Sequence, residues 1–217
     1  MTVLVTGPVT KDTTTVALGL AQIRIALAST YIGQIAPILT SSHSIGALAS
    51  TKFAGNVDFF KLESGFPLME DATFPLRESA MMEIAFKEQT PANWAVARGL
   101  DPTSYSSVHS GEINLGNMAT PVFLRMEAVY TFPDGVNTMT IILPRCQAVS
   151  SQEADFQAED VVAVSISLEA KRADSDVTGG NAIWNSSPIG KIVWNDATQT
   201  TTTTTSSSST TTTTTAP

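Results

Sequence analysis

The fold class follows from the stretch Glu78-Ser-Ala-Met-Met-Glu-Ile-Ala-Phe-Lys87, whose side chains follow a period of two. Successive side chains of a β-strand point to opposite faces of its sheet. The even-numbered residues from Ala80 to Phe86 are all apolar, while the odd-numbered residues from Ser79 to Lys87 include Glu83. The stretch therefore predicts a strand with one buried face and one outward face.

The same alternation recurs on both sides of this stretch and predicts further strands. Pro121–Phe132 and Val136–Val149 flank Pro133-Asp134-Gly135, a turn sequence that predicts a hairpin. Val161–Lys171 alternates over its whole length. Shorter or interrupted candidates are the segment from Val16 to Leu27, which changes phase near Ala21-Gln22, and the segments Val57–Leu62 and Lys191–Trp194.

One short helix is expected after the first strand. Thr90 is a suitable N-cap, Pro91 occupies the first helical position, and Gly99 is a suitable stop. With the strands, this helix indicates a mainly β chain. We predict an antiparallel β-sandwich or partly closed barrel with one short helix and extended N- and C-terminal arms.

The composition along the chain suggests three parts. Residues 1–15 are Thr-rich and predict an N-terminal arm, residues 16–196 form the β domain, and residues 197–217 are a Thr/Ser-rich C-terminal arm. Within the domain, residues 33–56 predict a long loop, of the kind that is usually functional. A Ser/Thr run has no apolar side chains to offset an ordering entropy of about 1–2 kcal/mol per residue. An ordered tail therefore needs neighbouring molecules, which suggests a subunit that is one of many.

The charge and cysteine content restrict the classes of partner. The formal net charge is −8, which disfavours tight binding to nucleic acid or to an anionic membrane. It remains compatible with nucleic acid that passes without binding. Cys146 is the single cysteine and excludes an intrachain disulfide. The apolar segment from Val16 to Ala28 contains Gln22 and Arg24 and is too short to span a membrane.

The residues that could support chemistry are few and scattered. His43 and His109 lie in Ser-rich loops, and a zinc site needs three or four converging ligands. The stretch from Asp174 to Asn181 resembles a calcium loop only weakly, because Asn185 stands where a bidentate acid is required. We therefore predict no catalytic residue, no cofactor and no metal, and we do not expect an enzyme.

The outward strand faces are the remaining candidates for function. Several of them carry single acids and small hydroxyl residues, which form either an ordinary solvated surface or the wall of an interface or channel. The candidate residues are Glu83, Glu127, Thr138, Thr140, Ser165, Ser167 and Glu169.

The order and character of several segments resemble a known family. They are Gly55–Gly65, Phe74-Pro-Leu-Arg-Glu78, the strand to Phe86-Lys-Glu88, the helix with Trp94, Gln157-Ala-Glu-Asp160, and Leu168 to Asp174. Together they resemble the tail tube (major tail) proteins of tailed bacteriophages over roughly residues 16–175. The resemblance is one of pattern and element order rather than of an invariant motif.

The resemblance implies a structural role. Tail tube proteins form rings, typically hexameric, which stack into a tube with a continuous inner β-barrel, a helix outside, and loops and arms that bridge rings. It implies that the seven candidate residues face an acidic lumen through which double-stranded DNA passes without specific binding during ejection. The partners implied are copies of the chain itself and other tail proteins at the tube ends, with no membrane anchoring. The location implied is the virion tail, after synthesis in the cytoplasm of the bacterial host.

Two other classes of protein stay open at this stage. A surface adhesin or carbohydrate-binding module would use the Thr/Ser tract as a linker, although an aromatic content of 7% is low for stacking on sugars. A capsid-decorating protein would also self-associate, but on a partner lattice.

Overall fold

The computed structural model describes residues 19–64, 69–105, 107–116, 120–149, 152–154 and 161–195. Residues 1–15 and 197–217, which the sequence predicts to be arms, lie outside these ranges, as does the segment Gln157–Asp160. The predicted domain boundaries at residues 16 and 196 therefore stay predictions.

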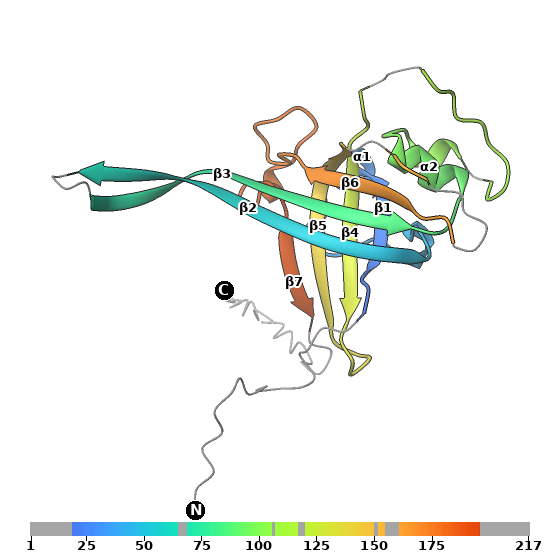
Figure 1. Cartoon of the computed structure of the whole chain (residues 1–217), viewed down its shortest axis with the longest axis horizontal. Coiled ribbons are helices and arrows are strands. Elements are labelled where there is room, and N and C mark those ends of the chain that lie inside the picture. The colour runs from blue at the N-terminus through green and yellow to red at the C-terminus, as the bar shows by residue number, and fades with distance from the viewer. Residues whose placement is uncertain are drawn as a thin grey trace, which may run out of the picture.

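The described chain is built mainly from strands (Figure 1). The strands are β1 Gln22–Leu27, β2 Leu48–Ser64, β3 Met69–Phe86, β4 Leu124–Thr131, β5 Thr138–Ala148, β6 Val164–Ala170 and β7 Lys191–Asn195. The α-helices are α1 Ala28–Tyr31 and α2 Pro91–Ala97, and 3-10 turns occur at Ser41–His43, Pro102–Ser104 and Ala182–Trp184.

All strands pair antiparallel in one sheet with the order β1-β4-β5-β6-β3-β2. One edge of β5 pairs with two strands. Its residues Cys146–Ala148 pair with β6, and its residues Thr138–Ile142 pair with β7. The β6-β3-β2 part therefore separates from β7 and crosses over β4 and β5 as a second layer (Figure 1). β1 and β2 stand at opposite ends of the order, so this sheet is not closed into a barrel. The prediction of a mainly β, sandwich-like fold is confirmed.

The alternating faces meet in one hydrophobic core between the two layers. Met82, Ile84 and Phe86 on β3 are at most 2% exposed, as the period of two predicted. They pack with the inward residues of four other strands, which are Ile23, Ile25, Leu124, Met126, Ala128, Ile141, Leu143, Val164, Ile166 and Leu168. Burying each large aliphatic side chain contributes about 1.5–3 kcal/mol to folding.

The prediction of a long loop at residues 33–56 is wrong for residues 48–56, because β2 begins at Leu48. Apart from Leu48 and Phe53, the residues up to Asn56 are small or polar, and they show no clear alternation, so their sequence alone does not indicate a strand. They become a strand by pairing with β3, in a register that runs from Leu48 opposite Phe86 to Ser64 opposite Met69. The strand predicted at Glu78–Lys87 is likewise the end of the longer β3.

The predicted helix is confirmed with its capping residues. The backbone N–H of Asn93 donates to Oγ1 of Thr90, Pro91 opens α2, and Gly99 follows it at a φ of +67°. The buried Asn93 side chain donates to the carbonyl oxygens of Ile45 and Glu88 at 2.9 and 2.8 Å. These bonds fasten α2 to the loop before β2 and to the segment that follows β3.

We predict that the thiol of Cys146 does not react in the folded protein. The side chain is fully buried on β5, and burial raises its pKa to about 12, so almost no thiolate is present at pH 8. Titration with a thiol-reactive chromophore should give no signal in native buffer and one thiol per chain in denaturant. Fast labelling of the native protein would contradict the buried placement of β5.

Candidate assembly surfaces

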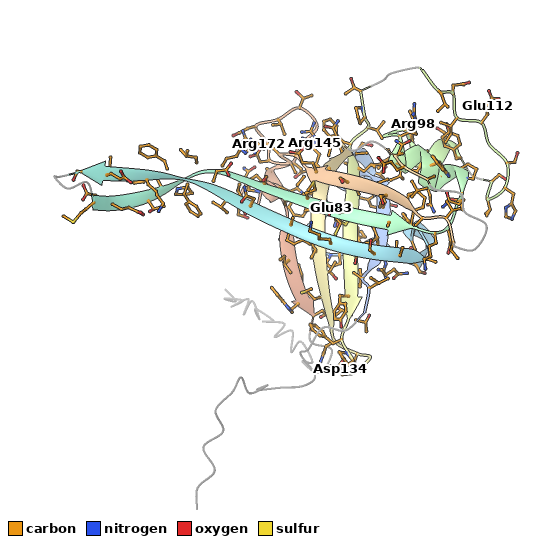
Figure 2. The ribbon with its side chains drawn as sticks, in the orientation of Figure 1. Glu83, Arg98, Glu112, Asp134, Arg145 and Arg172 are labelled. Atoms are coloured by element: carbon orange, nitrogen blue, oxygen red, sulfur yellow. The ribbon has the colours of Figure 1, made fainter. Side chains whose placement is uncertain are left out.

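Four of the seven candidate residues lie together on the outward face of β3 and β6. Glu83 lies opposite Ser167, and Ser165 and Glu169 are opposite Ala85 and Met81 on the same face. Figure 2 shows Glu83 in the middle part of β3, where β2 and β3 cross over the other strands. Ser165 is exposed, Ser167 is half-buried, and the carboxylate-bearing side chains of Glu83 and Glu169 are 40% and 39% exposed. The sheet therefore builds one polar face from these residues.

Both acids on this face already have a cationic neighbour. Lys52 Nζ lies 3.1 Å from Glu83 Oε2, and Lys171 Nζ lies 2.6 Å from Glu169 Oε2. Such exposed pairs contribute about 0–1 kcal/mol to stability. Their main effect is on the surface potential, because each glutamate charge is balanced by a lysine.

Glu127 does not face outward, and its prediction as a lumen residue is wrong. Its side chain is 0% exposed, and Oε1 accepts from Arg125 Nη2 at 2.7 Å and from Nε at 2.9 Å. Arg125 and Glu127 lie on the face of β4 turned away from the core, but the chain from Tyr31 to Leu39 covers this face. The alternation of β4 could not indicate this cover, because the covering segment comes from elsewhere in the sequence.

The buried ion pair holds the covering loop by its backbone. Arg125 donates to the carbonyl oxygens of Tyr31 at 2.9 Å, Ala36 at 2.7 Å and also Gln34. Glu127 accepts from the backbone N–H groups of Ile38 at 3.0 Å and Leu39 at 3.0 Å. The indole of Trp184 donates to the carbonyl oxygen of Ile32 at 2.7 Å and lies beside the guanidinium of Arg125. The loop is thus fixed without burying most of its side chains, and Ile35 and Ile38 stay exposed.

Thr138 and Thr140 lie on the same side of β5 as this covered face. Thr140 is buried and Thr138 is half-buried, and both line a cavity of about 450 Å³ with Arg24, Pro37, Val129, Val193 and Asn195. The prediction of Thr140 as an outward residue is therefore wrong. The β3–β6 face and the β4–β5 face point away from each other across the core, so the seven candidates cannot line a single bore of one subunit.

The sequence prediction missed a surface on the hairpin formed by residues 57–64 of β2 and residues 69–77 of β3. We call this hairpin the arm; it is distinct from the predicted N- and C-terminal arms. It projects far beyond the rest of the sheet (Figure 1). It exposes seven large apolar side chains by 38% to 69%, which are Val57, Phe59, Phe60, Leu62, Met69, Phe74 and Leu76. Because Phe59 and Phe60 are adjacent on one strand, they point to opposite faces. That pair of adjacent aromatics was the available sequence signal for a ribbon that is apolar on both faces.

Charged residues interrupt the apolar surface of the arm. Asp58 Oδ2 lies 3.4 Å from Arg77 Nε, and Lys61 Nζ lies 2.7 Å from Glu70 Oε2. Hydrogen bonds from Lys61 and Thr73 lower the pKa of Glu70 below its ordinary value. Glu63 lies directly opposite Glu70, an arrangement of like charges that opposes pairing. The described end of the arm is therefore both apolar and acidic.

The histidines and the Asp174 loop show no gathering of ligands. His43 Nε2 lies 3.1 Å from the hydroxyl of Tyr31. His109 is not part of this contact and lines a cavity with Trp94 and Arg98. Arg172 Nη2 bonds both Asp174 at 2.6 Å and Asp176 at 3.0 Å, so a guanidinium lies between these two acids. In the described part of the chain no three His, Cys, Asp or Glu residues are placed to hold a metal ion.

The chain has a distant likeness to known structures. No protein-family model matches the chain, and no curated protein matches its sequence. Among solved structures, the chain is similar to one from an extracellular contractile injection system, the PVC sheath–tube complex in its extended state. The identity is 11% and the TM-score is 0.38, over 71% of this chain and 88% of that one. Among the described residues, no helix is long and apolar enough to cross a membrane.

We predict that Glu127→Ala destabilises the fold strongly. Removing the carboxylate leaves the Arg125 charge buried without a partner, which typically costs about 3–5 kcal/mol. Glu83→Ala is the matched control, because Glu83 also forms an ion pair on a strand but is exposed, and its loss should change the free energy of unfolding by less than about 1 kcal/mol. Chemical denaturation followed by circular dichroism measures both values. Equal effects of the two substitutions would contradict the role of the buried Arg125–Glu127 pair in holding the covering loop.

Proposed function

We propose that the chain is a structural subunit that assembles with copies of itself into a tail-like tube, in a role that needs no catalysis. The observation that carries this proposal is the arm. A ribbon with exposed aromatic side chains on both faces has no core of its own, and an isolated two-stranded ribbon is at best marginally stable in water. Exposed patches of this kind mark surfaces that bind other proteins.

The size of the arm suits a specific interface. At up to about 150–250 Å² for a whole large side chain, the seven side chains, which are exposed by 38% to 69%, together offer on the order of 600 Å². A standard protein interface buries about 800 Å² on each partner, so the arm with its flanking polar residues approaches that size.

Sheet edges that are unpaired within the described residues support assembly between copies. β2 is the last strand in the sheet order and runs over 17 residues, a length of exposed edge that monomeric proteins usually avoid. A head-to-tail contact between different surfaces of one chain produces a ring when it closes, and rings can stack. A protruding arm on one side and open edges elsewhere are surfaces of this head-to-tail kind.

The resemblance to tail tube proteins extends the proposal to the contents of the tube. We propose that the outward β3–β6 face, with Glu83, Ser165, Ser167 and Glu169, lines the lumen, and that DNA passes along it during ejection from a virion. Small hydroxyl groups and lysine-paired acids give a surface without a strong field for phosphate, which suits passage without binding.

The arm is tested by the double substitution Phe59→Ser with Phe60→Ser. We expect wild-type protein to form rings or tubes in electron micrographs and fast-sedimenting species in the ultracentrifuge, and we expect the variant to remain monomeric. The control is Leu115→Ser with Val136→Ser, which removes two exposed apolar side chains outside the arm and should assemble normally. A wild-type protein that stays monomeric at high concentration, or an arm variant that assembles normally, would refute the proposal.

The lumen assignment is tested by Glu83→Lys with Glu169→Lys. In an assembled ring each substitution is repeated in every subunit, so the bore becomes strongly basic. We expect tubes that still assemble but particles whose DNA ejection is markedly slower and more dependent on salt. Ejection at the normal rate from particles that carry the variant would place these residues outside the bore.

A further inference from the structure

The sandwich is open on one side, where β7 and the β2–β3 ribbon diverge. β5 carries β7 along Thr138–Ile142 and β6 only along Cys146–Ala148, so the two layers part at this end. A cavity of about 150 Å³ opens there, lined mostly by apolar residues of four strands and of the chain before β1, including Phe53, Met82, Tyr130, Met139 and Ile141. We call this opening the wedge.

β7 extends the apolar lining of the wedge by one strand. Trp194 is opposite Met139 and Ile192 is opposite Ile141 on the face that belongs to the core. Trp194 is nevertheless 65% exposed and Ile192 is 40% exposed. Within the described chain, β7 pairs with β5 on one edge only, so its other edge offers unpaired backbone groups beside an exposed tryptophan.

We propose that the wedge and the free edge of β7 receive the arm of a second copy of this chain. This inference rests on the proposed self-assembly and names the surface that the arm meets. An arm strand laid along β7 would extend the sheet by backbone hydrogen bonds and would cover Ile192 and Trp194 with its own aromatic side chains.

The chemistry of the two surfaces is complementary. Both are extended and apolar, and within the described residues both have an unpaired edge, because β6 pairs with Met81–Phe86 and not with residues 69–77 of β3. The described end of the arm, residues 61–64 and 69–71, contains one lysine and three acids, and the only charged residue of β7 is Lys191. An arm strand on the free edge of β7 would bring these acids near Lys191, whose side chain lies on the face of β7 opposite Ile192 and Trp194.

The arm cannot fill the wedge of its own chain. Thr51 and Phe53 at the base of the ribbon line the wedge, while the arm continues away from the domain as the same paired hairpin (Figure 1). Folding back would break the β2–β3 pairing. The contact is therefore between copies and joins two different surfaces, which makes it head-to-tail.

Mixing two defective variants tests this contact. The arm variant is Phe59→Ser with Phe60→Ser, and the wedge variant is Ile192→Ser with Trp194→Ser. Each alone should be monomeric, and an equimolar mixture should give a 1:1 heterodimer and nothing larger, because one intact arm and one intact wedge remain. Trp194→Phe is the conservative control and should assemble as wild type does. Circular dichroism establishes that the variants are folded.

Disulfide trapping identifies the partner surfaces directly. Phe59→Cys and Phe60→Cys are each combined with Trp194→Cys in full-length protein, and native Cys146 does not interfere because it is fully buried. We expect oxidation to give covalent multimers with one of the two pairs. Cross-links within a single chain, or efficient trapping of neither pair in assembled protein, would overturn the inference.

The outcomes separate this inference from the proposed function. If the arm variant fails to assemble while the wedge variant assembles normally, the arm binds elsewhere and the inference is wrong, although self-assembly stands. If residues 1–18 of the same chain cover the wedge instead, their removal should increase the thiol reactivity of Trp194→Cys in the monomer, which again overturns the inference. If wild-type protein does not assemble at all, both are wrong.

Discussion

The buried ion pair between Arg125 and Glu127 is the interaction on which the arrangement of surfaces depends. Removing two charges from water costs several kcal/mol for each ion, and this cost is offset only when the remaining donors and acceptors are satisfied. Here the guanidinium donates to three backbone carbonyl groups, and the carboxylate accepts from two backbone N–H groups of the same loop. The pair is therefore stable because the loop lies over it, and the loop is held there because the pair satisfies its backbone.

This mutual dependence determines which strand faces are available to other molecules. The β4–β5 face is covered by residues 31–39 and by the turn that carries Trp184, so it is internal although its strands alternate like any surface strand. The β3–β6 face has no such cover in the described chain and keeps Glu83 and Ser165 accessible. The loop also presents Ile35 and Ile38 to solvent, since its backbone and not its side chains holds it in place.

The arm and the wedge share one physical property, which is that each lacks a second layer. Residues on the base of the β2–β3 ribbon pack on the core, but beyond Val57 the described ribbon is held by strand pairing and by ion pairs and hydrogen bonds on its surface. The wedge has a core face that continues past the end of the covering strands. A monomer with both features leaves apolar area in water on two separate surfaces, and the proposed association of copies would cover both at once.

Much of the strand pattern could be predicted from the sequence, because burial of one face makes apolar and polar residues alternate along each strand. The inward residues of β3, β4 and β6 follow from this alternation. The Pro133-Asp134-Gly135 turn and the Thr90 cap follow from the residue preferences of turns and helix ends. The candidate site was predicted less well. Glu83 and Glu127 occupy equivalent places in two alternating strands, and nothing near Glu127 in the sequence distinguishes it, yet one is exposed and the other has no exposed surface.

The sequence by itself thus determined the fold class, the strands with one buried face and the absence of a disulfide within the chain, since local periodicity and composition are sufficient for these. Only the tertiary structure decided that Leu48–Asn56 is part of a strand, that Glu127 is buried beside Arg125 under the covering loop, and that the β2–β3 ribbon extends beyond the hydrophobic core. Each of these depends on pairing or burial with a segment distant in the sequence. The local pattern of residues does not show which distant segment that is.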